Sequence, residues 1–219
     1  KPLALRLPPG QGRLLRQLML QMCRTLEQEI PSRLQGPEFK AESERIEKAY
    51  KLEEGKVYAA LDAFAEARRF ALYRENGHLV FTLLGDKGNA LTESEARSLP
   101  KDQRSRIDQG EQELREEIAR YLDKMRPLEL AMNESLSALR RQVVKPLLDH
   151  ALQEIRVGLK KQIKDSVKLG IYLDRVMHDV LDSLELFRIS DADDELRQEE
   201  LADALSRYHV NLLVRSEEH

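Results

Sequence analysis

The chain has 219 residues, with 36 basic and 39 acidic side chains and a formal net charge of −3. A nucleic-acid-binding surface needs a marked excess of basic residues, so the overall charge indicates no nucleic-acid partner. Charged residues make up 34% of the chain, aromatic residues make up only 5%, and tryptophan is absent. This composition is typical of long amphipathic helices with large solvated faces, and it disfavours a compact all-β protein.

Cysteine content and hydropathy restrict the environment in which the chain works. Cys23 is the only cysteine, so the chain forms neither an internal disulfide nor a cysteine-based zinc site. A lone free thiol fits a reducing compartment, and we expect a cytoplasmic location. No apolar run reaches the roughly 18 residues that a membrane-spanning helix requires, so we predict no membrane span.

The first third of the chain begins with a short apolar segment and continues as helix. Residues 3–7 are apolar and are followed by a Pro-Pro-Gly sequence, which predicts a strand ending in a turn. Apolar residues at helical spacing predict a helix from Arg13 to Glu29, which Pro31 and Gly36-Pro37 are expected to end. The same spacing predicts a second helix from about Glu38 to Arg69.

The hydrophobic period then changes from helical to alternating. Two apolar segments, residues 70–73 and 78–84, flank Asn76 and Gly77. Asn-Gly supplies the two positive-φ residues of a type I′ turn, so we predict a β-hairpin at about residues 70–84. Thr92 followed by Glu95 fits a capping box that opens a short helix.

A long helical region is predicted from Lys101 to about Phe187. Pro127 and Pro146 are expected to kink or interrupt it, and Gly170 is expected to mark a break before a last helix. Its second half is predicted to bury a stripe spaced mostly by four residues. That stripe consists of Leu136, Leu139, Val143, Leu147, Ala151, Ile155, Leu159 and Ile163.

The C-terminal part is predicted to contain a polar joint, a helix and a strand. The joint covers residues 191–194, the helix residues 196–208 and the strand residues 210–214. Because an isolated strand leaves its backbone groups unsatisfied, the two terminal strands either pair with each other or belong to a sheet outside this chain. Both alternatives place the termini at the base of a helical body, as in an insertion into a host domain.

We therefore predict a mainly α fold: an elongated antiparallel helical bundle or coiled coil with one small β-hairpin and a short strand stub at each terminus. Residues 1–12 would form the first stub of the host. Residues 13–190 would form the helical insertion. Residues 191–219 would form a connecting helix and the returning stub.

The residues show no convincing catalytic constellation. Pro9–Arg13 opens a helix after glycine, but it lacks the lysine and the hydroxyl of a phosphate-binding loop. Asp174, His178 and Asp182 are four residues apart and would share one helical face. They offer fewer ligands than a closed metal site needs, so a solvated face is favoured over a metal-dependent enzyme. The sequence therefore predicts no catalytic, cofactor-binding or metal-binding residue in this chain.

Several segments are similar to one protein family. Residues 4–13, ALRLPPGQGR, resemble the RALRLPAGxGR stretch of the Lon-related ATP-dependent proteases, in their LonB-like branch. Residues 208–214, YHVNLLV, resemble the RYxVNVLVD stretch of that family. Residues 171–181 resemble its YLDxVxxDV segment. The resemblance extends over almost the whole chain.

The resemblance implies a part of a larger machine. In these proteins an AAA+ ATPase module, which uses ATP and magnesium, drives a Ser-Lys endopeptidase, and the assembly is a hexamer. This chain would be the helical insertion within the ATPase module, with protein substrates as partners. It lacks the nucleotide-binding motifs, the arginine finger and the protease serine and lysine. We therefore expect the chain itself to be non-catalytic and the parent protein to be the enzyme.

The expected role is substrate engagement or gating of the ATPase and protease chamber. Candidate polypeptide contacts are the residues at the predicted hairpin tip: Tyr73, Asn76, Gly77 and His78. If a helix covers the hairpin incompletely, its edge would bind extended polypeptide by strand addition. The alternative is a stand-alone coiled-coil adaptor or scaffold that binds a protein partner through its apolar seam.

Overall fold

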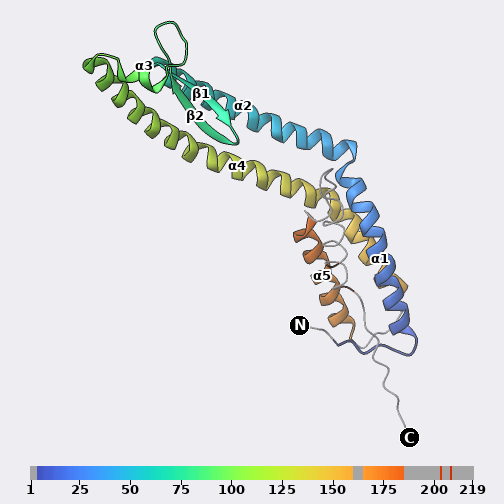
Figure 1. Ribbon diagram of the computed structural model, residues 1–219. Helices are drawn as coiled ribbons and strands as arrows, with labels where there is room; N and C mark the ends of the chain where they lie inside the picture. Colours follow the sequence, from blue (N-terminus) through green and yellow to red (C-terminus); the bar gives the residue numbers. More distant parts are fainter. Residues whose placement is uncertain (1–3, 160–164, 185–202, 204–207, 209–219) are drawn as a thin grey trace. The chain divides into compact units, whose positions relative to one another are not determined.

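The computed structural model describes residues 4–159, 165–184, 203 and 208, and it confirms a mainly α protein with one small β-hairpin (Figure 1). The elements in chain order are α1 (Gln11–Leu34), α2 (Pro37–Ala67), β1 (Phe70–Glu75), β2 (His78–Leu83), α3 (Glu93–Arg97), α4 (Lys101–Gly158) and α5 (Ser166–Asp182). The described residues fall into two compact units. Unit 1 comprises those within 1–43 and 136–219, and unit 2 comprises residues 44–135.

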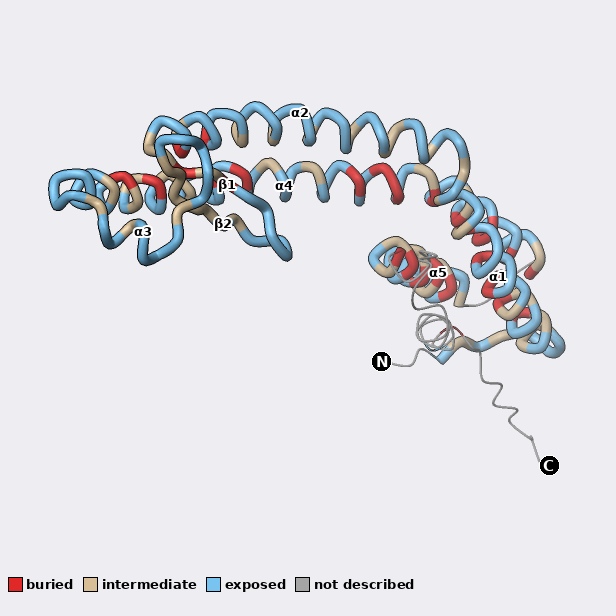
Figure 2. Tube along the Cα trace, turned by 45° about the horizontal axis from the view of Figure 1, so that its top comes forward, coloured by how far each residue is buried: buried red, intermediate tan, exposed pale blue. Residues whose placement is uncertain are grey.

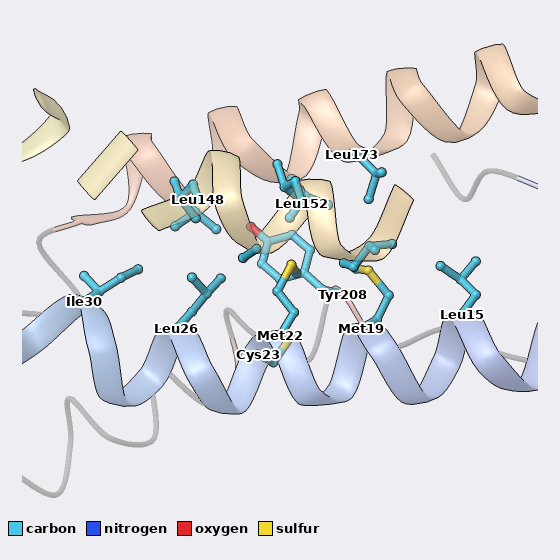
Figure 3. Close-up of a cluster of buried hydrophobic side chains, with 14 of the residues drawn as sticks. Leu15, Met19, Met22, Cys23, Leu26, Ile30, Leu148, Leu152, Leu173 and Tyr208 are labelled. Atoms are coloured by element: carbon cyan, nitrogen blue, oxygen red, sulfur yellow. The ribbon is translucent and has the colours of Figure 1, made fainter. Parts of the chain in front are cut away.

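Unit 1 is built on one apolar core shared by three helices. Figure 3 shows α1 contributing Leu15, Met19, Leu26 and Ile30, which meet side chains of α4 and α5. Gly158, the last residue of α4, permits close contact with α1, because a Cβ at this position would lie 2.9 Å from Leu18 Cδ1. Burial of this apolar surface is the main source of the unit's stability.

Unit 2 contains a second, separate core. Its buried members come from α2, the hairpin and the first part of α4: Leu61, Ala65, Phe70, Leu72, Leu114, Tyr121 and Met125. Tyr58 of α2 meets Tyr121 of α4 edge to face, and Arg68, directly after α2, forms an ion pair with Glu113 of α4. The two contacts occur in opposite order along the two segments: Tyr58 precedes Arg68, whereas Tyr121 follows Glu113. The two helices therefore run antiparallel in this unit. Buried and exposed positions alternate along α4, as expected for an amphipathic helix (Figure 2).

The predicted interruptions at Pro31, Pro127 and Pro146 are wrong, whereas the predicted boundary at Gly36-Pro37 is confirmed, since α1 ends at Leu34 and α2 begins at Pro37. Pro31 lies inside α1, and α4 runs without interruption through Pro127 and Pro146. A proline in a helix interior costs about 3 kcal/mol. Near Pro146, fully buried Val144 and Leu148 offset that cost, since burying each such side chain contributes about 1.5–3 kcal/mol.

The break before the last helix also lies elsewhere. Gly170 is an interior residue of α5, where Leu169 and Leu173 are buried on either side of it. The long helix ends at Gly158 instead, where the glycine faces Leu18. The predicted break at Gly170 is therefore wrong, because the buried Leu169 and Leu173 hold this part of α5 on the core of unit 1.

The buried stripe of the second half of α4 is confirmed at Leu136, Leu139, Ala151, Ile155 and Leu159, but it differs from the prediction in between. Val144 and Leu148 are fully buried, whereas the predicted Val143 and Leu147 are only half-buried. Because α1 and α5 both pack on this part of α4, it buries a wider face than a two-helix seam would.

The terminal predictions are only partly covered by the described residues. Residues 4–7 form no strand; Leu5 and Leu7 pack against the core of unit 1, and the Arg6 backbone N–H donates to Asp165 Oδ2 at 2.8 Å. The predicted joint at 191–194 and strand at 210–214 lie outside the described residues. Only residues 203 and 208 of the predicted helix at 196–208 are described. The predicted N-terminal strand is therefore not formed at residues 4–7, and the placement of the two termini in a host sheet stays a prediction.

Candidate functional site: the hairpin of unit 2

The hairpin has the predicted turn. Asn76 has φ 49° and Gly77 has φ 78°, which are the two left-handed residues of a type I′ turn. Glu75 pairs with His78 across the turn, and the antiparallel register continues to Phe70 opposite Leu83. The prediction of a hairpin at this Asn-Gly pair is confirmed.

The two faces of the hairpin differ in exposure. One face carries residues that turn toward the helices of unit 2: Phe70, Leu72, Arg74, Leu79, Phe81 and Leu83. The other face carries Ala71, Tyr73, Glu75, His78, Val80 and Thr82. Tyr73 and Val80 pair directly across the strands on this outer face, and they are 50% and 38% exposed. We call Tyr73 and Val80 the outer apolar pair.

The four predicted contact residues are brought together at one end of the hairpin. Tyr73 and His78 lie on the outer face, and Asn76 and Gly77 form the turn between the strands. All four are exposed. Sequence reasoning did not single out Val80, although strict alternation places it opposite Tyr73 once the turn is fixed.

Aromatic contacts anchor the base of the hairpin. Phe70 and Phe81 meet edge to face, with ring centroids 5.4 Å apart and an interplanar angle of 89°. The Arg115 guanidinium of α4 lies 5.2 Å from the Phe81 ring centroid. Such contacts add stability beyond the apolar area they bury. They fix the inner face on α4 and so leave the outer face turned away from it.

Arg74, near the tip of the hairpin, contacts both α2 and α4. Its Nη2 lies 2.5 Å from Glu54 Oε1 and donates to the Tyr121 hydroxyl at 3.4 Å. The guanidinium also lies 4.4 Å from the Tyr58 ring centroid. Burial raises the pKa of Tyr121, and the Glu54 contact raises the pKa of Arg74 despite its desolvation. One signal of this role is visible in the alternation of the strand, which places an arginine at an inward position among apolar residues.

A second ion pair holds the chain where α2 ends and β1 approaches. Arg68 Nε donates to Glu113 Oε2 at 2.7 Å, and its guanidinium lies 3.4 Å from the Phe64 ring centroid. The hydrogen bond from Arg68 lowers the pKa of the Glu113 carboxyl. The hairpin is therefore fixed at its base and near its tip by charged side chains.

The hydrogen-bond pattern shows which edge of the hairpin is open. Leu84 N donates to Arg69 O at 2.8 Å, so these two residues form a hydrogen-bonded pair. In an antiparallel ladder such pairs alternate with non-hydrogen-bonded ones, so the next hydrogen-bonded pairs are Ala71 with Thr82, Tyr73 with Val80 and Glu75 with His78. The backbone groups of Leu79, Phe81 and Leu83 consequently point away from β1. Leu83 O accepts from Leu91 N at 2.9 Å, within a short bridge next to Leu84 and Ala90.

The rival metal site is not assembled. Asp174 pairs with Arg156 at 3.4 Å and Asp182 pairs with Arg141 at 2.7 Å, so both carboxylates lie against α4. Within the described part of the chain, no three histidine, cysteine or acidic side chains are grouped to hold a metal ion. The structure therefore favours a structural role for Asp174 and Asp182.

The segment Pro9–Arg13, which was compared with a phosphate-binding loop, forms a turn followed by the start of α1. Gly10 adopts φ 84° directly before α1, and Gln11 N donates to Pro8 O at 3.0 Å. Cys23 lies in the core of unit 1, where burial raises the pKa of its thiol to about 11. Such a thiol is far from the thiolate form that nucleophilic chemistry uses.

Comparison with known proteins gave no match: no family model, no curated protein and no solved structure is similar to this chain. Across the described residues, no helix is both long enough and apolar enough to cross a membrane.

Proposed function

We propose that this chain is a non-catalytic helical module that engages polypeptide through the outer face of its hairpin, as the insertion of a Lon-related ATP-dependent protease. The observation that carries the engagement role is the outer apolar pair. It is presented by a hairpin that Arg68, Arg74 and the Phe70–Phe81 contact fix in place. A fixed, exposed aromatic and aliphatic pair is a suitable contact for apolar side chains of another polypeptide.

The family assignment has separate support. Residues 4–13 and 208–214 resemble the motifs of Lon-related proteases, and the mainly helical fold suits an insertion. Under this proposal ATP and magnesium are bound by the parent protein, which would be the Ser-Lys endopeptidase and assemble as a hexamer in the cytoplasm. This chain would contribute substrate engagement or gating.

The engagement role is tested by changing the outer apolar pair. The variant Tyr73→Ser with Val80→Thr keeps the inner face intact and removes the exposed apolar surface. We expect binding of a reduced, carboxymethylated protein to the 219-residue chain to fall about tenfold, which is the effect of removing one good contact residue. Val157→Thr is the matched control, because Val157 is also exposed but lies on α4 in unit 1. Equal binding by all three proteins would refute the engagement role.

The family assignment is tested by the natural reading frame around this segment. The proposal requires a nucleotide-binding GKT or GKS loop upstream and a protease serine and lysine downstream. The purified 219-residue chain should then hydrolyse neither ATP nor peptide. A natural protein with neither motif in its flanks would contradict the assignment.

One observation favours a second candidate, an adaptor that binds a partner helix. Leu122 and Leu130 of α4 are 50% and 60% exposed in unit 2. Exposed leucines on a helix are a suitable contact for another amphipathic helix. Loss of partner binding in Leu122→Ser with Leu130→Ser, but not in the Tyr73 and Val80 variant, would select this function.

A further inference from the structure

The outer edge of β2 lacks the devices by which proteins normally protect an exposed strand. Its six residues, HLVFTL, include no lysine, acidic residue or proline. Edge strands usually carry such residues, a bulge or a cover, because unpaired backbone groups recruit other strands. The sequence of β2 therefore offers no charged residue and no proline against strand pairing, and Ala90 and Leu91 cover only its end at Leu83 and Leu84.

Two residues of this edge have unpaired backbone groups. Leu79 and Phe81 point their N–H and C=O groups away from β1, and within the described residues no backbone hydrogen bond reaches them. The opposite edge is different, because Phe70 and Leu72 of β1 are buried. Leu79 and Phe81 are only half-buried. The accessible edge is thus that of β2.

The protein's own chain already begins a third strand on this edge. Ala90 and Leu91 pair beside Leu84 and Leu83, and the pairing stops there. A strand extended from this bridge along the edge of β2 would lie beside Phe81 and Leu79 and end near the turn. A segment of about five residues would extend it with the spacing of a regular sheet.

We propose that the outer edge of β2 binds an extended polypeptide segment by strand addition, with main-chain hydrogen bonds to Leu79 and Phe81. This inference deepens the proposed engagement function and rests on it. The unpaired groups are alternating donors and acceptors at strand spacing, which is the pattern that another polypeptide backbone matches. The occupant is therefore extended polypeptide with apolar residues at alternate positions, whose side chains reach the outer apolar pair or the edges of Leu79 and Phe81.

This binding mode would have little specificity for the sequence of the bound polypeptide. Main-chain hydrogen bonds are common to all residues except proline, and the flanking side chains offer apolar contact without a charged partner on β2. A site of this kind suits unfolded segments of many different proteins, with proline-rich segments excluded.

Leu79→Pro tests the edge directly. Proline removes the outward N–H at residue 79, whereas the bonds that join His78 and Val80 to β1 remain. Leu79→Ala is the matched control, because it shortens the same side chain and keeps the N–H. The probe is a fluorescein-labelled heptapeptide of alternating valine and threonine, and its binding to the 219-residue chain is followed by fluorescence anisotropy. We expect Leu79→Pro to weaken binding tenfold or more and Leu79→Ala to weaken it less than threefold.

Amide hydrogen exchange of the unmodified chain gives a second measurement that does not depend on a variant's folding. Saturating heptapeptide should slow exchange at Leu79 and Phe81 and leave Val80, which already bonds to Tyr73, nearly unchanged. This alternating protection is the signature of an added strand. Protection of all or none of the three amides would overturn the proposal.

Other outcomes would also overturn strand addition, and they separate it from the engagement function. Equal binding by Leu79→Pro and Leu79→Ala, together with weak binding by the Tyr73 and Val80 variant, would mean docking on the outer face alone. Engagement would then stand without strand addition. Concentration-dependent protection of Leu79 and Phe81 without peptide, with the protection of Phe81 lost in Leu79→Pro, would make a second copy of this chain the occupant. No heptapeptide binding at all would refute strand addition, while the carboxymethylated protein would still test engagement.

Discussion

Burial decides what individual reactive side chains of this chain do. Cys23 lies among apolar side chains of unit 1, and its thiol has a pKa of about 11 because the charged form is desolvated. Arg74 of unit 2 shows the opposite balance: desolvation lowers the pKa of its guanidinium, but the hydrogen bond to Glu54 and the charge of Glu54 raise it by more, so the net shift is upward. The Cys23 thiol is therefore poorly ionised, whereas Arg74 pairs with Glu54 and holds the hairpin on α2.

Cys23 is predicted to react slowly with alkylating reagents. At pH 8, a thiol with a pKa of about 11 has about 100-fold less thiolate than one with the usual value near 9. We therefore expect iodoacetamide to modify Cys23 at least about 100-fold more slowly in the folded chain than in 6 M guanidinium chloride. Comparable rates in the two conditions would show that the thiol is accessible and ionised.

The Arg68–Glu113 pair predicts a dependence of stability on pH. The pKa of Glu113 is lower in the folded chain than its usual value near 4.5, so the pair stabilises the folded state above that value. This contribution is lost as the pH falls through the folded-state pKa. Glu113→Gln should lower the thermal midpoint at pH 7, and the difference from the unmodified chain should shrink as the pH falls below 4.5 and through the folded-state pKa, as measured by circular dichroism. A difference that stays equal over this pH range would contradict the pair's role.

At the scale of single elements, the hairpin was predictable because its signal is local. Two positive-φ residues are required at the turn, and Asn76-Gly77 supplies them. The capped start of α3 is equally local, since Thr92 Oγ1 accepts a hydrogen bond from Glu95 N. The continuity of α4 through two prolines was not predictable in this way. Near Pro146 it depends on Val144 and Leu148, whose burial exists only after α1 and α5 have packed, and near Pro127 it depends on Met125, which is buried with residues of α2 and the hairpin.

Gly77 and Gly55 are predicted to respond oppositely to the same substitution. Gly77→Ala places a Cβ at φ 78° and should destabilise the hairpin by about 1–2 kcal/mol. Gly55→Ala lies within α2, where a Cβ would meet nothing within 4 Å, and should stabilise by about 1 kcal/mol. Denaturant unfolding followed by circular dichroism measures both. The same sign for the two variants would contradict the turn or the helix assignment.

At the scale of the whole molecule, the two units have separate apolar cores. Leu114 belongs to the core of unit 2 and Leu152 to that of unit 1, and each is almost fully buried. The sequence revealed the helical stripes that supply these cores, but it did not show where one core stops and the other begins. That division depends on which helices pack on α4 along its length.

Leu114→Ala is therefore predicted to act on one unit. Truncating a fully buried leucine costs about 2–5 kcal/mol, and we expect faster amide exchange in the hairpin and in residues 44–67. Exchange in α1 and α5 should change little. Leu152→Ala should give the reverse pattern. Uniform acceleration throughout the chain in either variant would show that the cores are not energetically separate.

The candidate site was only partly predictable. Tyr73, Asn76, Gly77 and His78 followed from the turn, whereas the anchor made by Arg74 with Glu54 joins residues from a strand and a helix. No periodicity within one segment reveals such a pair. The resemblance to Lon-related proteases also remains a proposal, since comparison with known proteins gave no match.

The most direct test of the central claim is the degradation of an unfolded protein by the parent protein carrying Tyr73→Ser and Val80→Thr. If the hairpin engages substrate, KM for the carboxymethylated protein should rise about tenfold. Basal ATP hydrolysis and cleavage of a short peptide that enters without engagement should change less than about twofold. An unchanged KM for the protein substrate would contradict the account.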